Sequence, residues 1–160
     1  MVKRFDQGGI SAQSVRALFL TSAFVQFLRF DVVAEDAQRG TVSLRLPFDH
    51  RYTIVSDLGH YHGGVIAAFV DIAASMCCVM ATGTPTPTVD LRIDYLRSPR
   101  NVDLIADAKM WKAGRSIATA DVVIRDADGI TYALGRGAFS VSNSKASMFP
   151  TLPAEQEGTR

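Results

Sequence analysis

Several features that mark common protein classes are scarce or absent in this sequence of 160 residues. The only two cysteines, Cys77 and Cys78, are adjacent, and neighbours along a helix cannot reach disulfide geometry without distortion. The net charge is only +1, so no charge excess points to nucleic acid or to a membrane surface as a partner. We therefore expect reduced thiols in a core, a cytoplasmic protein, and no nucleic-acid or membrane partner.

Sequence motifs of several enzyme classes are also missing. No serine lies in a G-x-S-x-G pattern, which disfavours a Ser-His-Asp hydrolase. No glycine pattern is typical of a phosphate-binding or dinucleotide-binding loop. The spacing of His50, Asp57, His60 and His62 matches no established zinc site. The sequence thus predicts no metal ion and no resident cofactor.

An apolar run at residues 17–28 follows two basic residues and has some likeness to a signal peptide. The run is too short to span a bilayer, and an aspartate interrupts the basic stretch. We expect instead a covering helix over residues 11–28, capped by Ser11 or Ser14.

The most informative segment is a long apolar one, residues 65–80, in which only Asp71 and Ser75 are not apolar. A stretch that is apolar on all sides predicts a buried helix, on which these two residues share a face. An ionised aspartate is rarely buried without a partner, because the loss of its water is costly. Asp71 is therefore either a structural carboxylate tied to backbone donors or part of a functional site.

The chain enters this helix through His62, Gly63 and Gly64. Two glycines in a first turn lower helix propensity by about 1 kcal/mol each relative to alanine. They offer bare N–H groups at the positive end of the helix dipole, where an anion or a developing oxyanion can bind. With Asp71, this helix start indicates an acyl-transfer site; the alternative is a glycine pair needed for close packing or a tight turn.

The rest of the sequence predicts strands on both sides of the helix. Alternating apolar residues and turn signals place strands at residues 31–36, 41–46, 89–95, 102–110, 117–125 and 131–141. The plan is α+β: an antiparallel sheet wrapped around one long central apolar helix, with an extra N-terminal helix. We expect three segments: a helical extension, one folded domain and a flexible tail, at residues 1–29, 30–142 and 143–160.

Several of these residues together resemble a known family. The residues on which the resemblance rests are His62-Gly63-Gly64, Asp71, and the strand TVDLRIDYLRSP that begins at Thr88. They are similar to the hotdog-fold acyl-CoA thioesterases, most of all to the phenylacetate-pathway (PaaI-like) branch related to 4-hydroxybenzoyl-CoA thioesterases. The resemblance covers residues 30–142 and implies the hotdog fold.

The resemblance also implies a mechanism. The Gly63 or Gly64 amide would polarise the thioester carbonyl, and Asp71, supplied by the neighbouring subunit, would act as base or nucleophile. Thr88 stands where many relatives carry a hydroxyl that holds the water or the carboxylate. Ser56 departs from the pattern, because members of this branch place an amide side chain there; its hydroxyl would assist instead.

The resemblance implies an acyl-CoA thioesterase that releases an acid and coenzyme A, in a homodimer or homotetramer with shared active sites. Coenzyme A is then part of the substrate and no cofactor is expected. A non-catalytic acyl-CoA-binding protein of the same fold is the alternative, because of Ser56. We expect the substrate to be bound by residues at the helix start, on the helix face and at strand ends: His62, Ser75, Arg97, Arg100 and Arg115.

Overall fold

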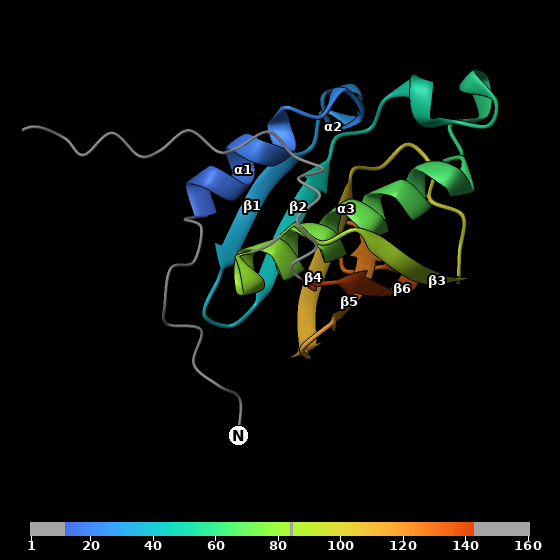
Figure 1. The fold of residues 1–160 in the computed structure, drawn as a ribbon. Helices are drawn as coiled ribbons and strands as arrows, with labels where there is room; N and C mark the ends of the chain where they lie inside the picture. Colours follow the sequence, from blue (N-terminus) through green and yellow to red (C-terminus); the bar gives the residue numbers. More distant parts are fainter. Residues whose placement is uncertain (1–11, 84, 143–160) are drawn as a thin grey trace, which may run out of the picture.

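Six strands form one antiparallel sheet that curves around a single long helix (Figure 1). The computed structural model describes residues 12–83 and 85–142. The strand order is β1-β2-β4-β5-β6-β3, so that β1 and β3 are the edges. The strands are β1 (Asp31–Asp36), β2 (Thr41–Leu46), β3 (Thr88–Tyr95), β4 (Leu104–Ala113), β5 (Ile117–Arg125) and β6 (Thr131–Ser140), and the central helix is α3 (Gly63–Thr82). The predicted α+β plan and its six strands are confirmed.

The strands form because their apolar residues alternate and meet across the sheet in register. In the β2–β4 pair, Val42 lies opposite Ala108 and Leu44 lies opposite Ala106. These side chains are buried on the face that holds α3. Alternate residues such as Arg45 point to the other, solvent-exposed face. The two-residue period therefore gives one apolar face for the helix to cover.

Small residues on that face allow α3 to approach closely. The facing positions of the three central strands are occupied largely by alanine and glycine: Ala106, Ala108, Ala118, Ala120, Ala133, Gly135 and Gly137. At Gly135 the fit is tightest, since a methyl group there would lie 2.4 Å from Cγ1 of Val70. These small residues leave room for the helix, while larger side chains such as Leu104, Ile124 and Phe139 fill the core elsewhere on the same sheet.

The N-terminal segment differs from its prediction. Two helices, α1 (Ala12–Leu20) and α2 (Ala23–Leu28), replace the single helix expected over residues 11–28. The break occurs at Ser22, whose backbone is extended and whose hydroxyl accepts a hydrogen bond from the Val25 N–H at 3.4 Å. A side chain that caps a new helix competes with continuation of the old one. Ser11 lies outside the described residues, and Ser14 lies within α1 rather than before it.

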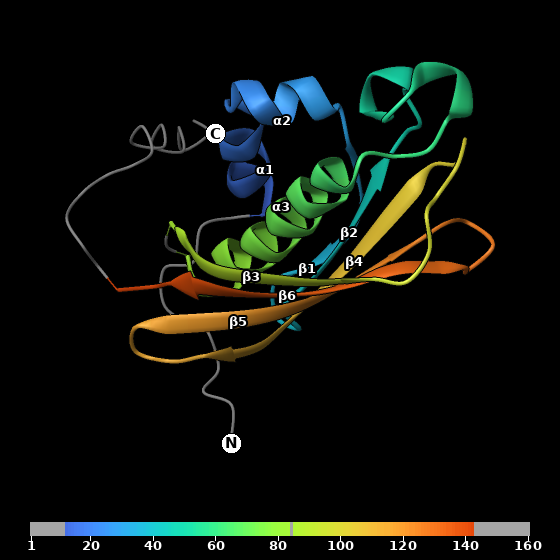
Figure 2. The same cartoon turned by 90° about the vertical axis from the view of Figure 1, so that its right-hand side faces the viewer.

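The covering role of this segment is confirmed. Val15 and Leu28 are buried in the core, and Figure 2 shows α1 and α2 beside α3, on the side away from β5 and β6. Among the described residues, α3 alone is long and apolar enough to cross a membrane, but 67% of its most apolar window is buried within the fold. That burial is typical of the core helix of a folded domain.

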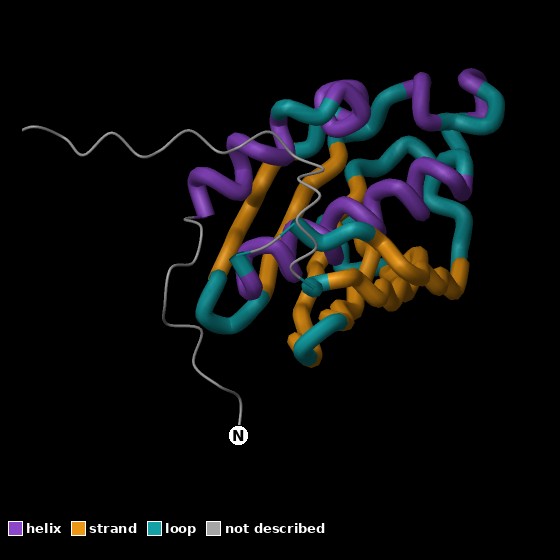
Figure 3. Tube along the Cα trace, in the orientation of Figure 1, coloured by secondary structure: helices purple, strands orange, loops and turns teal. Residues whose placement is uncertain are grey.

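The connection from β2 to α3 contains two short 3-10 helices, η1 (His50–Tyr52) and η2 (Ser56–Leu58), shown in Figure 3. Tyr52 anchors the connection, because its ring is buried and its hydroxyl donates to the Leu28 carbonyl at the end of α2. The Tyr52 carbonyl in turn accepts from the His62 N–H at 2.8 Å. The start of α3 is therefore fixed to the body of the protein.

Both cysteines are free and buried in α3, as expected. Burial raises the pKa of the Cys77 and Cys78 thiols to about 12. The Cys77 thiol donates to the Gly40 carbonyl at 2.8 Å, at the turn between β1 and β2. The prediction of reduced core residues is confirmed.

We expect Gly135→Ala to destabilise the protein by about 1–3 kcal/mol, because the new methyl meets the stiff side chain of Val70. The melting temperature should fall by roughly 2–4 °C for each kcal/mol. In a thermal double-mutant cycle, Val70→Ala should relieve the clash, so that the double variant is less destabilised than the sum of the two single changes. Strict additivity would show that the helix can shift away from this contact.

Candidate active site

The first turn of α3 leaves one backbone donor without a partner. The His62 ring caps the helix, with Nδ1 accepting from the Gly64 N–H at 2.9 Å. The Val65 and Ile66 N–H groups both donate to the His62 carbonyl, at 2.9 and 3.5 Å. No described residue accepts from the Gly63 N–H. Gly63, rather than Gly64, is therefore the amide available to an incoming oxygen.

The space beside Gly63 is open. A methyl group on Gly63 would lie 3.6 Å from the Tyr95 ring, an ordinary contact, so packing within the chain does not require glycine there. A methyl on Gly64 would lie 3.0 Å from His62 Nδ1, which is tight. Glycine at position 64 thus leaves room for the His62 ring that caps the helix. Glycine at position 63 leaves its N–H accessible to a molecule outside the chain.

Tyr95 holds the same turn from the other side. Its hydroxyl donates to the Gly63 carbonyl at 2.9 Å. The peptide unit between Gly63 and Gly64 is therefore held at both ends, with Tyr95 on its carbonyl and His62 on its N–H. The sequence places Tyr95 in the strand predicted over residues 89–95 and in the motif that carries the resemblance, but it predicts no contact of Tyr95 with the start of the helix. A hydroxyl-bearing side chain at the end of that strand was the available signal.

A groove of about 360 Å³ runs beside this turn, between α3 and the segment that follows β3. Its walls are mostly apolar, with one cation: Tyr61, Gly63, Ile66, Tyr95, Leu96, Arg97, Ser98 and Pro99. The Arg97 guanidinium is anchored by a hydrogen bond to the Thr131 carbonyl at 2.8 Å. Of the three arginines predicted to bind substrate, Arg97 is the one that lines the groove.

The other two arginines lie elsewhere in the chain. Arg100 donates through Nε to the Leu58 carbonyl at 2.8 Å, on the loop before α3. Arg115 is exposed on the β4–β5 hairpin. That hairpin follows Met110, whose N–H donates to the Gly40 carbonyl near Ala81 in the last turn of α3. Within one chain, Arg115 therefore lies at the opposite end of α3 from Gly63.

Asp71 lies on the flank of α3 that the sheet leaves uncovered. Asp71 and Ser75 are half-buried, as are Ala67 and Ala68 on the same flank, so this part of the helix is partly open to solvent in the single chain. The Thr88 hydroxyl donates to Asp71 Oδ1 at 2.8 Å. The partner of the carboxylate is thus a side-chain hydroxyl at the start of the edge strand β3, and not a set of backbone donors.

Two further candidates have other contacts in this structure. Ser75 exchanges a hydrogen bond with Thr86, their hydroxyl oxygens 3.1 Å apart. Ser56 is exposed at the start of η2, and its carbonyl accepts from Nδ1 of His50 at 3.0 Å. The Ser56 hydroxyl does not line the groove, so the structure does not bring Ser56 and Gly63 together.

Comparison with known proteins identifies the fold. A model of the thioesterase superfamily matches residues 58–133, a range that contains Gly63, Asp71 and Thr88 but begins after Ser56. A Halobacterium salinarum protein, provisionally named an esterase, is 34% identical over 121 residues, which cover 69% of this chain and 80% of the relative. The chain belongs to the thioesterase superfamily. Its activity is thioester hydrolysis, and the predicted hotdog fold is confirmed.

Other members of the superfamily are similar over shorter or more distant matches. The medium/long-chain acyl-CoA thioesterase YigI of Salmonella typhimurium is 33% identical over 95 residues, half of this chain and 61% of that protein. Zebrafish thioesterase superfamily member 2 is 26% identical, with a TM-score of 0.72 over 82% of this chain and 95% of that one. The PaaI protein of Escherichia coli shares the fold at 22% identity, with a TM-score of 0.71 over 80% and 90%.

The helix geometry separates the two groups of the candidate site, Gly63 and Asp71. Gly63 and Asp71 are eight residues apart on α3, which places them about 12 Å apart along the axis. A carbonyl of about 1.2 Å, with contacts of about 3 Å to the amide, to the attacking water and from that water to the carboxylate, spans at most about 10 Å. One chain therefore cannot present its own Gly63 amide and its own Asp71 carboxylate to the same thioester.

We expect Tyr95→Phe to lower kcat about five- to tenfold, with KM changed less than twofold. The ring contact remains, but one hydrogen bond worth about 1 kcal/mol is lost from the peptide that follows the Gly63 amide. Tyr52→Phe is the matched control: it also removes a hydroxyl that donates to a backbone carbonyl, that of Leu28 on α2, while the Tyr52 ring and the Tyr52 carbonyl that accepts from His62 remain. It should lower the melting temperature more and kcat not at all. Equal losses of kcat in both variants would assign the Tyr95 effect to stability.

Proposed function

We propose that this chain hydrolyses an acyl-CoA or aryl-CoA thioester to the free acid and coenzyme A, at sites built from two copies of the chain. The observation that carries the proposal is the placement of an open Gly63 amide and a half-exposed Asp71 on one helix, too far apart to act together within one chain. The acyl-CoA substrate is supported by YigI, which is named for medium- and long-chain acyl-CoA. The aryl alternative comes from the resemblance of His62-Gly63-Gly64, Asp71 and the strand from Thr88 to the PaaI-like branch.

In this proposal the thioester carbonyl oxygen accepts a hydrogen bond from the Gly63 N–H. That N–H belongs to the peptide whose carbonyl, on His62, already accepts from Val65 and Ile66. Hydrogen bonds to a peptide carbonyl polarise the unit and strengthen its N–H as a donor. The helix dipole adds positive potential at the same point. The negative charge that develops on oxygen in the tetrahedral intermediate is therefore stabilised.

Asp71 of the second copy activates the water molecule that attacks the carbonyl carbon. The Thr88 hydroxyl occupies Oδ1, so Oδ2 is the oxygen left to accept a proton from water. The water oxygen bonds to carbon, its proton passes to Asp71, and the carbon–sulfur bond breaks as the thiolate of coenzyme A leaves. Direct attack by Asp71, followed by hydrolysis of the mixed anhydride, is the second route open to the same carboxylate.

The single chain presents surfaces that fit a second copy. The edge strand β3 pairs only with β6, and its residue Val89 is 61% exposed. The uncovered flank of α3 beside it bears Ala67 and Ala68, which permit a close neighbour. Pairing of β3 with β3 about a two-fold axis would continue the sheet and bring the two α3 flanks together. We propose a homodimer built in this way, and a tetramer of two such dimers.

We propose that three arginines contact the phosphates of coenzyme A. Arg97, in the groove beside Gly63, suits a phosphate of coenzyme A, and we retain Arg100 and Arg115 as further phosphate contacts. Ser56 supplies fewer donors than the amide that the resemblance implies at this position, so it assists at most through a bound water.

We also propose a cytoplasmic location, which the two reduced cysteines support.

The direct test is turnover of a panel of acyl- and aryl-CoA thioesters, with detection of the released thiol. Multiple turnover of at least one thioester is expected. Stoichiometric binding without thiol release would support the alternative, a non-catalytic acyl-CoA-binding protein, and would overturn the proposed hydrolysis of coenzyme A thioesters.

We expect Gly63→Pro to reduce kcat by about a hundredfold or more, because proline removes the one open N–H. Proline is well suited to the first position of a helix, and the extended backbone of His62 (φ −68°, ψ 132°) is suitable before proline. Gly63→Ala is the control that keeps the N–H. Similar melting temperatures with a loss of kcat only in the proline variant are expected; equal kcat in both would exclude the amide as the oxyanion donor.

A mixing experiment tests whether the site is shared. Gly63→Pro and Asp71→Asn chains should each be nearly inactive alone. When equal amounts are unfolded together and refolded, half of the dimers are mixed, and each mixed dimer has one intact site. About a quarter of the wild-type activity should then return. Mixtures that stay inactive, although mixed dimers are demonstrated by mass spectrometry, would place Gly63 and Asp71 in the same chain's site.

A further inference from the structure

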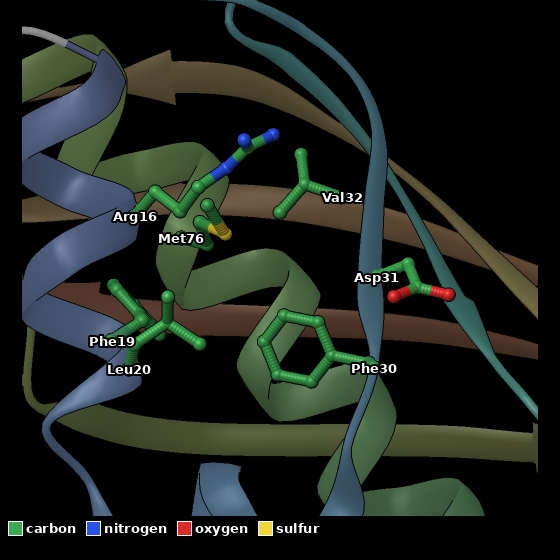
Figure 4. Close-up of a pocket in the computed structure, with 7 residues that line it drawn as sticks. All are labelled: Arg16, Phe19, Leu20, Phe30, Asp31, Val32 and Met76. Carbon is green, nitrogen blue, oxygen red and sulfur yellow. The ribbon is translucent and has the colours of Figure 1, made fainter.

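A second cavity lies on the other side of α3 from the candidate active site. It has a volume of about 320 Å³ and is formed by α1, the start of β1 and α3, with seven lining residues: Arg16, Phe19, Leu20, Phe30, Asp31, Val32 and Met76 (Figure 4). Met76 follows Asp71 by five residues, which is about 140° around the helix. The cavity is therefore separated from the Asp71 flank by the body of α3.

The interior of this cavity is apolar and supported by the core. Met76 is fully buried and forms the floor, and its flexible thioether suits a ligand of variable shape. Phe30 packs against Phe69 of α3, with ring centroids 6.4 Å apart. Phe19 and Val32 are also packed against the core. The volume lies at the small end of the range for ligand sites, about 300–1,000 Å³.

The rim of the cavity carries an uncompensated positive charge. Figure 4 shows the Arg16 side chain extending from α1 toward Val32. No described residue forms an ion pair with Arg16. The one carboxylate at the cavity, Asp31, points away beyond the β1 ribbon in Figure 4 and lies 3.5 Å from Arg45 instead. The cavity thus combines an apolar interior with one guanidinium that has no ion-pair partner in residues 12–83 and 85–142, which favours an amphipathic anion.

We propose that this cavity binds a medium-chain fatty carboxylate, with the chain on Met76 and Phe30 and the carboxylate on Arg16. The ligand is of the class that hydrolysis of a medium-chain acyl-CoA releases, so its link to the reaction rests on the proposed function, whereas the binding itself does not. Coenzyme A and its thioesters carry several phosphate charges that one guanidinium does not match. The site is a second one, distinct from the site at Gly63 and Asp71.

Calorimetric titration of the full chain with decanoate and with decanol tests the charge requirement. Decanoate should bind at one site per chain, at least tenfold more tightly than decanol. Arg16→Gln should weaken decanoate about tenfold and leave decanol within twofold, which removes the preference. Arg39→Gln, an exposed arginine at the β1–β2 turn, is the matched control and should change neither affinity. An unchanged decanoate affinity in Arg16→Gln would overturn the proposal.

Two further variants locate the binding site. Val32→Phe should fill the cavity and abolish binding of both probes while acyl-CoA hydrolysis stays within twofold of wild type. Asp71→Asn should abolish hydrolysis and leave decanoate binding unchanged. Loss of hydrolysis in a folded Val32→Phe variant, or loss of decanoate binding in Asp71→Asn, would show that the cavity belongs to the catalytic site and would overturn its independence. If the variants affect decanoate binding as expected but the protein cleaves no thioester, the binding of a fatty carboxylate in the cavity would be supported and the proposed function would be refuted.

Discussion

The contact on which the rest of the structure depends is the close seat of α3 on the central strands. Because Gly135 and the alanines of β4 and β5 leave room at the centre of the sheet, the helix can approach the curved face closely. The sheet on one side and α1 and α2 on the other bury most of the circumference of α3, and the flank beside the start of the edge strand β3 stays partly open. That flank carries Asp71, and the end of the same helix carries Gly63. The two chemical groups of the site are thus positioned by a packing requirement that concerns neither of them.

The start of α3 is held rigid by two side chains that leave the Gly63 N–H free of contacts with the described residues. A pair of glycines is flexible, and an amide that stabilises charge must be held still before the charge appears. In this protein the peptide between Gly63 and Gly64 is held by His62 on one side and by Tyr95 on the other. Their hydrogen bonds use the groups of that peptide and leave the preceding N–H, that of Gly63, open. Rigidity therefore comes from neighbours of the donor and not from contacts that would block it.

Much of this arrangement could be predicted from the sequence, because the signals were local. The two-residue alternation of β2 and the unbroken apolar run of α3 specify a strand and a core helix by themselves. The break at Ser22 was missed because apolar spacing continues across it, whereas the hydroxyl that caps α2 acts against that spacing. The partial exposure of Asp71 could not be predicted either. Helical periodicity gives the faces of a helix, but how far a sheet wraps around them depends on strands distant in the sequence.

The burial of both thiols has a practical consequence for the study of this enzyme. Cys77 and Cys78 are the only sulfhydryl groups in the chain, and with a pKa near 12 they are almost entirely protonated at neutral pH. Protonated, enclosed thiols react poorly with disulfide reagents and alkylating agents. In an assay of the native protein with a coenzyme A thioester, colour developed by such a reagent therefore comes from released coenzyme A and not from the protein. The same two groups become reactive when the core opens, so the rate of their labelling measures the opening of α3 from its sheet.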